Sequence, residues 1–197
     1  YFEASGGSRS AGRILGRLMI CDPAHQSITE LAAALGMSKA SISMVIRQTL
    51  MQDPNIAAVG IGSGYPGRIF QSLNAFRPEG SPETDFFGIY QGRVSPEYFS
   101  TLRVEFAAGR DFSRDQDSNL DRVVIINETA ARMLGWDAAT AVSKRLVEID
   151  DDEPVEDRTH TIIGVTKDYH LESLQEAVKP MVVYGNTSAD QYNTSYA

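Results

Sequence analysis

The first 50 residues carry the spacing of amphipathic helices. Between residues 10 and 21, apolar side chains recur every three or four positions, which predicts one helix. Ser27 and Glu30 then form a capping box at the start of a second helix, which Gly36 ends. Ser38 opens a third helix over the next apolar positions. A helix, a tight glycine turn and another helix make a supersecondary unit that fits the major groove of DNA.

After residue 50 the pattern changes to short apolar runs of the strand type. Residues 62–85 are rich in glycine, proline and polar side chains, which predicts a long loop or a frayed hairpin. Short helices are predicted after Ser95, over residues 127–134 with Asn127 as N-cap, and for one turn at 171–175. Strands are predicted at residues 56–61, 86–94, 104–107, 123–126, 145–149, 159–165 and 181–184.

The predicted fold class is therefore α+β. A small N-terminal helical (helix-turn-helix) segment, residues 1–50, is followed by a mixed α+β domain, residues 51–197.

Composition and charge restrict the partners of each part. Of the 197 residues, 42% are hydrophobic and 22% are charged, so the chain is able to bury a core. The net charge is −8, yet residues 1–50 hold five basic and three acidic side chains. Because the acidic remainder repels phosphate groups, we expect nucleic-acid binding only in the first quarter of the chain.

Cysteine content and hydropathy limit other classes of protein. Cys21 is the single cysteine, so neither an internal disulfide nor a thiolate metal site is expected. No apolar run approaches the ~18 residues of a membrane-spanning helix. The sequence begins at Tyr1 and carries no signal peptide. We therefore expect the chain to be a fragment of a longer protein.

The third predicted helix supplies candidate DNA-binding residues. Lys39 and Arg47 are able to contact phosphate or guanine, while hydroxyl groups nearby hydrogen-bond to base edges or phosphates. The alternative is a small helical bundle with an ordinary polar surface. The candidate DNA-binding residues are Ser38, Lys39, Ser41, Ser43 and Arg47.

The run GRILGRLMICDPAHQSITELAAALGMSKASIS, residues 12–43, resembles the winged-helix regulators of the MarR superfamily, specifically the GbsR-like group. The resemblance implies a cytoplasmic DNA-binding transcriptional regulator that acts as a dimer. The wing and the dimerisation helices of that family do not follow in this sequence. A module without them should bind DNA with the weak affinity of non-specific contacts.

A second resemblance covers more of the chain. Its motifs are PNIAAVGIGSGYPG (54–67), GRVSPEYFSTL (92–102), AGRDFS (108–113), VVIINETAARMLGW (123–136), SKRL (143–146) and TIIGVTKDYHLESL (161–174), followed by Lys179-Pro180. They resemble the MacB-like periplasmic core domain of ABC-transporter permeases of the FtsX-like class. Ser143 stands where that family usually has glycine.

This second resemblance implies a non-enzymatic domain on the extracytoplasmic face of the bacterial inner membrane. It implies coupling of ATP-driven membrane motions to a partner or substrate. The partners implied are transmembrane helices, an ATPase and a periplasmic protein, and a homodimer is left open. The second half of the family's extracytoplasmic region is not found, so we expect a truncated domain with an open sheet edge.

Several matching residues are expected to maintain the fold. Gly109 suits an unusual backbone turn, and Arg110 and Asp111 are expected to form a local ion pair. Three aromatic side chains are expected to anchor the core, namely Tyr98, Phe99 and Phe112.

The sequence offers no convincing catalytic, cofactor or metal site. It lacks GxSxG, HExxH and a Walker lysine, and His25, His160 and His170 have no ligand spacing. Lys167 to His170 form a polar cluster after a strand, which we interpret as a structural corner rather than an acid–base site. The acidic run at residues 148–157 is interpreted as a solvated hairpin tip rather than a calcium loop.

Two functions therefore remain open, a transporter domain and a DNA-binding regulator. A helix-turn-helix works in the cytoplasm, whereas a periplasmic domain must be exported, and no membrane helix separates the two segments. We therefore also expect that the chain joins two unrelated fragments at about residues 48–53. That hypothesis predicts few apolar contacts between residues 1–47 and 56–184.

Overall fold

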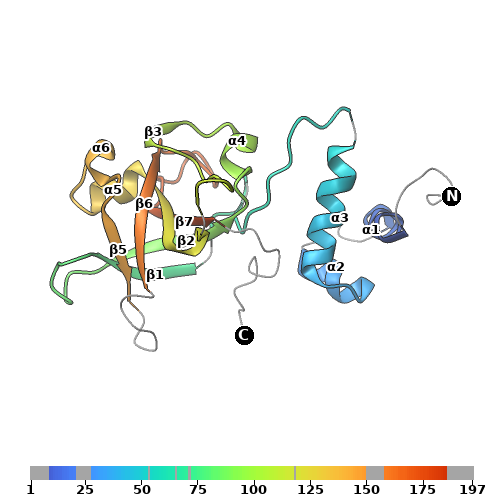
Figure 1. Ribbon diagram of the computed structural model, residues 1–197, viewed down its shortest axis with the longest axis horizontal. Helices are drawn as coiled ribbons and strands as arrows, with labels where there is room; N and C mark the ends of the chain where they lie inside the picture. Colours follow the sequence, from blue (N-terminus) through green and yellow to red (C-terminus); the bar gives the residue numbers. More distant parts are fainter. Residues whose placement is uncertain are drawn as a thin grey trace. The chain divides into compact units, whose positions relative to one another are not determined.

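The computed structural model describes residues 9–20, 28–52, 54–64, 66–70, 72–117, 119–149 and 158–185. The chain divides into two compact units, with the boundary between Val59 and Gly60 (Figure 1). We call them the helical unit and the sheet unit. The division into domains at residues 50 and 51 stays a prediction.

Three helices form the helical unit: α1 (Arg9–Ile20), α2 (Ile28–Leu35) and α3 (Lys39–Met51). All three predicted helices are therefore confirmed. Gly36 ends α2 with a φ of +61°, and the Ser38 side chain caps α3 by accepting a hydrogen bond from the Ser41 amide. Ser27, of the predicted capping box, and Cys21 lie outside the described residues.

One small core holds the helical unit together. Ile14, Leu31 and Ile42 are buried, one from each helix. The guanidinium of Arg13 donates to the carbonyl oxygen of Leu35, at the C-terminal end of α2, where backbone acceptors lack helical partners. The helical spacing seen in the sequence thus corresponds to a packed face.

The sheet unit is mixed α+β, as predicted. Its seven strands lie in the order β3-β6-β4-β7-β2-β1-β5. The strands are β1 (Ser72–Pro78), β2 (Phe87–Val94), β3 (Phe106–Gly109), β4 (Val123–Asn127), β5 (Arg145–Glu148), β6 (Thr159–Thr166) and β7 (Met181–Gly185). The short helices are α4 (Tyr98–Leu102), α5 (Glu128–Met133) and α6 (Ala138–Ala141).

The sheet closes on itself. β5 pairs with β1 on one side and with β6 on the other, and β5 and β6 run side by side in Figure 1. Six strands therefore form a ring, and β3 extends it from β6. Among the described residues only β3 has an unpaired side, so the open sheet edge that we expected is confined to one short strand.

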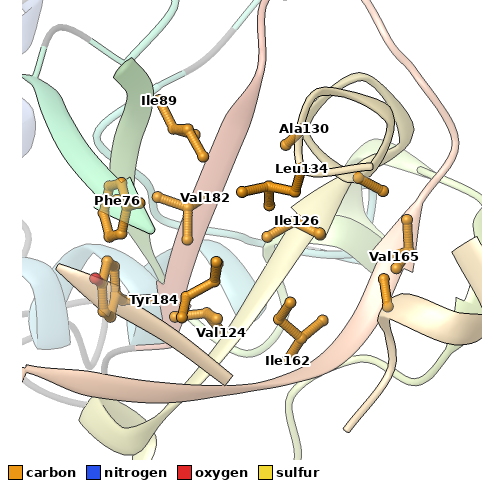
Figure 2. Close-up of a cluster of buried hydrophobic side chains, with 13 residues drawn as sticks. Phe76, Ile89, Val124, Ile126, Ala130, Leu134, Ile162, Val165, Val182 and Tyr184 are labelled. Carbon is orange, nitrogen blue, oxygen red and sulfur yellow. The ribbon is translucent and has the colours of Figure 1, made fainter. Parts of the chain in front are cut away.

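Two apolar clusters lie on opposite faces of these strands, because side chains alternate along a strand. Phe76, Val124, Val182 and Tyr184 belong to the first cluster, together with Leu134, which follows directly after α5 (Figure 2). The second cluster lies under α4 and contains the three predicted anchors, which are buried: Tyr98, Phe99 and Phe112. The anchor prediction is therefore confirmed.

Three secondary-structure predictions were wrong, and the first concerns a strand. Residues 56–61 are not a strand. A single antiparallel bridge joins Gly62 to Val94, which would place residues 56–61 opposite residues 95–100, where β2 has ended and α4 begins. Within the polar segment 62–85, β1 pairs with β2, so the hairpin alternative was the better one.

The other two errors concern helices. Ser95 does not cap α4; the helix begins at Tyr98, and the Ser95 hydroxyl accepts a hydrogen bond from the Ile61 amide at 3.1 Å. Residues 171–175 form a non-helical turn, in which the Leu171 carbonyl oxygen accepts from the Gly67 amide at 2.6 Å. The predicted strand at 104–107 lies two residues later, as β3.

Candidate functional site

The five candidate DNA-binding residues do not share one exposed face. Ser38 is exposed, and its hydroxyl lies 2.9 Å from that of Ser41. Lys39 and Arg47 are half-buried. Ser43 is only 5% exposed, so it does not lie on an exposed face of α3. Both α1 and α2 pack against α3, so the buried surface of α3 is wider than the single apolar face of a helix with one neighbour. DNA contact by the others stays a prediction.

Asn127 connects three parts of the sheet unit, namely the end of β4, the start of α5 and the start of β7. Its Oδ1 accepts hydrogen bonds from the Ala130 amide at 3.0 Å and the Met181 amide at 2.9 Å. Its Nδ2 donates to the Lys179 carbonyl oxygen at 2.9 Å. Asn127 is therefore the N-cap of α5, as predicted, and it also fixes the start of β7. The second role was not visible in the sequence, because 52 residues separate Asn127 from Lys179.

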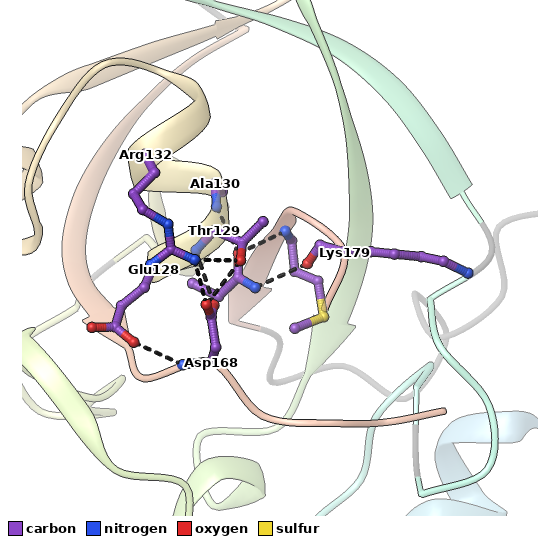
Figure 3. Close-up of polar contacts among 8 residues, drawn as sticks. Glu128, Thr129, Ala130, Arg132, Asp168 and Lys179 are labelled. Atoms are coloured by element: carbon purple, nitrogen blue, oxygen red, sulfur yellow. Dashed lines mark hydrogen bonds and ion pairs between the residues drawn. The ribbon is translucent and has the colours of Figure 1, made fainter. Parts of the chain in front are cut away.

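Asp168 fixes the same helix from the segment after β6. Its carboxylate accepts from the Thr129 amide at 2.9 Å, the Thr129 hydroxyl at 2.8 Å and the Arg132 guanidinium at 2.6 Å (Figure 3). Although burial opposes ionisation, these donors lower the pKa of Asp168. The Asp168 amide donates to Glu128, at the positive N-terminal end of α5. We conclude that Asp168 has a structural role in this unit.

Arg110 does not form its ion pair with Asp111. Its guanidinium makes two bonds to the Asp117 carboxylate, at 2.6 and 2.9 Å, and the Asp117 carboxylate also accepts from the Ser113 amide. Asp111 instead accepts from the Phe112 amide at 2.7 Å. Burial, and then the negative charge of Glu97, raise the pKa of Asp111 to about 6. Arg110 therefore closes a loop, and Asp111 is left in a site that disfavours its charge.

The chain enters the sheet unit through a segment pressed onto aromatic side chains. A Cβ at Gly62 would lie 2.6 Å from the Tyr98 ring, and one at Gly64 would lie 2.6 Å from the Phe70 ring. The Tyr98 hydroxyl donates to the Gly64 carbonyl oxygen at 2.8 Å. Only glycine permits this close approach, so the glycines of the segment 60–64 serve packing.

The chain also leaves the sheet unit beside the point where it enters. Val94, at the end of β2, bridges to Gly62 on one side. On its other side Val94 pairs with Gly185, the last residue of β7. Neighbouring strands lie about 4.8 Å apart, so roughly 10 Å separates the two connections. Both connections of the sheet unit therefore lie at the same end of β2.

The described histidines do not build a metal site. Among the residues described, no group of three or more histidine, cysteine, aspartate and glutamate side chains is placed to hold an ion. His160 is buried, lies edge-on to Tyr184 and has Nδ1 at 2.9 Å from the Asp121 carbonyl oxygen. Burial lowers the pKa of His160. His25 lies outside the described residues, and His170 is exposed.

No described helix combines the length and the apolar character that a bilayer crossing requires. The longest described helix, α3, has 13 residues.

Comparison with known proteins gives two kinds of similarity. A family model for the MacB-like periplasmic core domain matches residues 25–195, which is most of the chain. In addition, 50 residues are 48% identical to the HTH-type transcriptional regulator MmpR5 of Mycobacterium tuberculosis. That stretch covers 25% of this chain and 30% of the regulator.

Solved structures with a similar chain trace come from transport proteins. One is a domain of a permease protein from Porphyromonas gingivalis, with a TM-score of 0.48, 18% identity, and coverage of 76% of this chain and 62% of that one. Another is the periplasmic region of MacB from Actinobacillus actinomycetemcomitans, with a TM-score of 0.46, 14% identity, and coverage of 73% and 65%. The chain spans less than two thirds of either.

Proposed function

Because the chain belongs to the family of MacB-like periplasmic core domains, we propose that its sheet unit couples ATP-driven motion of an ABC-transporter permease to a partner or substrate outside the membrane. In this role the domain performs no chemistry itself. It moves as one body when the segments that hold it move.

The observation that carries this proposal is the pair of connections flanking β2. Gly62 and Gly185 pair with the two sides of Val94. The two segments that connect the sheet unit to the rest of the permease would therefore both act at the same end of the unit. The incoming segment is fixed by the bond from Tyr98 to Gly64 and by the Ser95 amide, which donates to Ile61 at 2.7 Å. A displacement of that segment would therefore reach α4 and β2 directly. The closed sheet favours transmission of the displacement over local deformation.

The first test reads the gene at its native locus beyond both ends of this sequence. Apolar spans of ~20 residues on the two sides of the sheet unit are expected. A reading frame that continues without such spans would contradict a permease.

A second test addresses the coupling itself. Hydrogen exchange is measured on the full-length permease in lipid discs, with and without a non-hydrolysable ATP analogue. We expect the nucleotide analogue to change the rate of amide hydrogen exchange in residues 60–64 and 95–101. The paired amides of β4 and β6 should remain protected from exchange. Tyr98→Phe should weaken this response without altering nucleotide binding, and Tyr90→Phe is the matched control. Nucleotide binding that leaves the exchange of both segments unchanged would refute the coupling.

A second candidate function is supported by the helical unit. Its α2, Gly36 turn and α3 have the order of a DNA-reading motif, and the 48% identity to a helix-turn-helix regulator supports this interpretation. The test is binding of duplex DNA, both random and from upstream of the gene, at several salt concentrations. A salt-dependent affinity that falls on Lys39→Ala and Arg47→Ala but not on Arg145→Ala, in the sheet unit, would support a regulator. Equal effects of all three changes would oppose it.

A further inference from the structure

A cavity of 420 Å³ lies in the sheet unit. It is bounded by the C-terminal end of α4, the residues leading into β3, and the segment that follows β6. Leu102, Val104 and Leu171 supply aliphatic side chains to its lining. The volume falls within the range that organic ligands occupy in proteins, about 300–1,000 Å³.

The charged side chains around this cavity fall into two groups. Lys167 bonds to Glu105 at 2.5 Å, and Asp168 is held by Arg132 and Thr129 as described above. Arg103 and His170 also line the cavity, and within the described part of the chain neither side chain has a hydrogen bond or an ion pair. Among these side chains, those still available to a ligand are the Arg103 guanidinium and the His170 imidazole.

The backbone at Arg103 supports a role for its side chain. Arg103 ends α4 in the left-handed conformation, with a φ of 55°. Glycine normally takes this position without strain, whereas a side chain there costs free energy. Of the described residues other than glycine, only Arg103 and Ser143 have a positive φ. A strained residue whose side chain lines a cavity points to a function for that side chain.

We propose that this cavity binds an amphipathic organic anion. The apolar part of the ligand packs on Leu102, Val104 and Leu171, and its carboxylate or sulfonate group accepts hydrogen bonds from Arg103, with His170 beside it. A guanidinium suits this purpose because its N–H groups bind the two oxygens of one anionic group together. The proposal does not depend on the coupling role.

The test uses two dyes of nearly the same shape, added to the whole chain. 8-Anilinonaphthalene-1-sulfonate carries the anionic group, and N-phenyl-1-naphthylamine has the same rings without it. Fluorescence titration gives both affinities, and backbone NMR shifts locate the dye. We expect shifts at residues 102–105 and 167–171, and a tighter complex with the sulfonate.

Arg103→Asn removes the charge but keeps a residue that tolerates the left-handed conformation. It should weaken binding of the sulfonate dye about tenfold, as expected for one charged hydrogen-bonding contact, and leave the neutral dye unaffected. Arg103→Lys should retain most of the affinity, and Arg145→Gln, on β5, should retain all of it.

The outcomes distinguish binding at this cavity from non-specific hydrophobic binding of the dyes elsewhere on the protein. NMR shifts confined to the helical unit, or to the exposed Leu174, would overturn the proposal. An equal loss of both dyes on Arg103→Asn would also overturn it, because the anionic group would then contribute nothing. Displacement of the sulfonate dye by decanoate, but not by decanol, would extend the result to carboxylates.

Discussion

Ser143 offers the sharpest test of the backbone argument, because it holds a conformation that suits glycine. It lies between α6 and β5 with a φ of 71°, its side chain is exposed, and its amide donates to the Ile162 carbonyl oxygen at 2.8 Å. The left-handed conformation costs a residue with a side chain about 1–2 kcal/mol. Ser143→Gly would remove this cost while keeping the amide bond.

The expected gain is smaller than the strain, because glycine also makes the unfolded chain more flexible. That effect costs about 0.5–1 kcal/mol. We therefore expect Ser143→Gly to raise the free energy of unfolding of the sheet unit by about 0.5–1 kcal/mol. Urea denaturation followed by Trp136 fluorescence measures it well, since Trp136 is the single tryptophan and Lys144 lies 4.6 Å from its ring.

Two further variants control for the chemistry of the change. Ala139→Gly adds the same flexibility at an exposed position of α6 that has no positive φ, so it should lower stability by about 1 kcal/mol. Ser143→Ala keeps the Cβ and removes only the hydroxyl. It should therefore change the free energy of unfolding by only a few tenths of the change expected for Ala139→Gly. A loss on Ser143→Gly as large as that on Ala139→Gly would refute the reasoning.

Two other predictions concern buried polar groups. The raised pKa of Asp111, about 6, means that the folded state binds this proton more tightly than the unfolded state, so stability is lost as the pH rises from about 4 to 6. Asp111→Asn should therefore raise the free energy of unfolding by about 1 kcal/mol at pH 8 and leave it unchanged at pH 4. The value allows for solvent screening at a half-exposed side chain. Equal changes in the free energy of unfolding at both pH values, measured by urea denaturation, would contradict this prediction. Asn127→Ala should cost about 2–4 kcal/mol, because it leaves buried donors and an acceptor without partners. The matched change Asn119→Ala, at the exposed cap of the turn Leu120–Arg122, should cost under about 1 kcal/mol, and thermal melts with similar losses would show that Asn127 has no special role.

Local sequence signals were sufficient wherever both faces of an element are buried. The runs that became β4 and β7 are almost entirely apolar, β6 has an apolar centre at residues 162–165, and the structure buries most residues of all three. β1 was predicted only as part of a frayed hairpin, with a loop as the alternative, because Phe76 alone among its seven residues is buried and the pattern resembles a loop. Its conformation comes from pairing with β2 and β5, which lie elsewhere in the sequence.

The polar contacts were predicted only where they are local. Asn127 and Ser38 bond to amides three residues ahead, a spacing that helix N-caps commonly use. Asp168 bonds to a residue 39 positions away, which requires knowledge of the strand order. Arg110 was assigned to the wrong aspartate because adjacency was used as a guide, whereas the loop geometry brings Asp117 to it.

The closed sheet also bears on how the two resemblances can occur in one chain. Ile61, which bonds to Ser95, is the first residue with a described hydrogen bond to the sheet unit. All of the described strands come from residues after the helical unit. Its ring of strands and both of its apolar clusters are complete without α1, α2 or α3. The sheet therefore places no requirement on what precedes residue 60. A join between unrelated fragments near residues 48–53 would leave every strand pairing intact, so the hypothesis of a fused origin is physically consistent with a well-packed sheet unit.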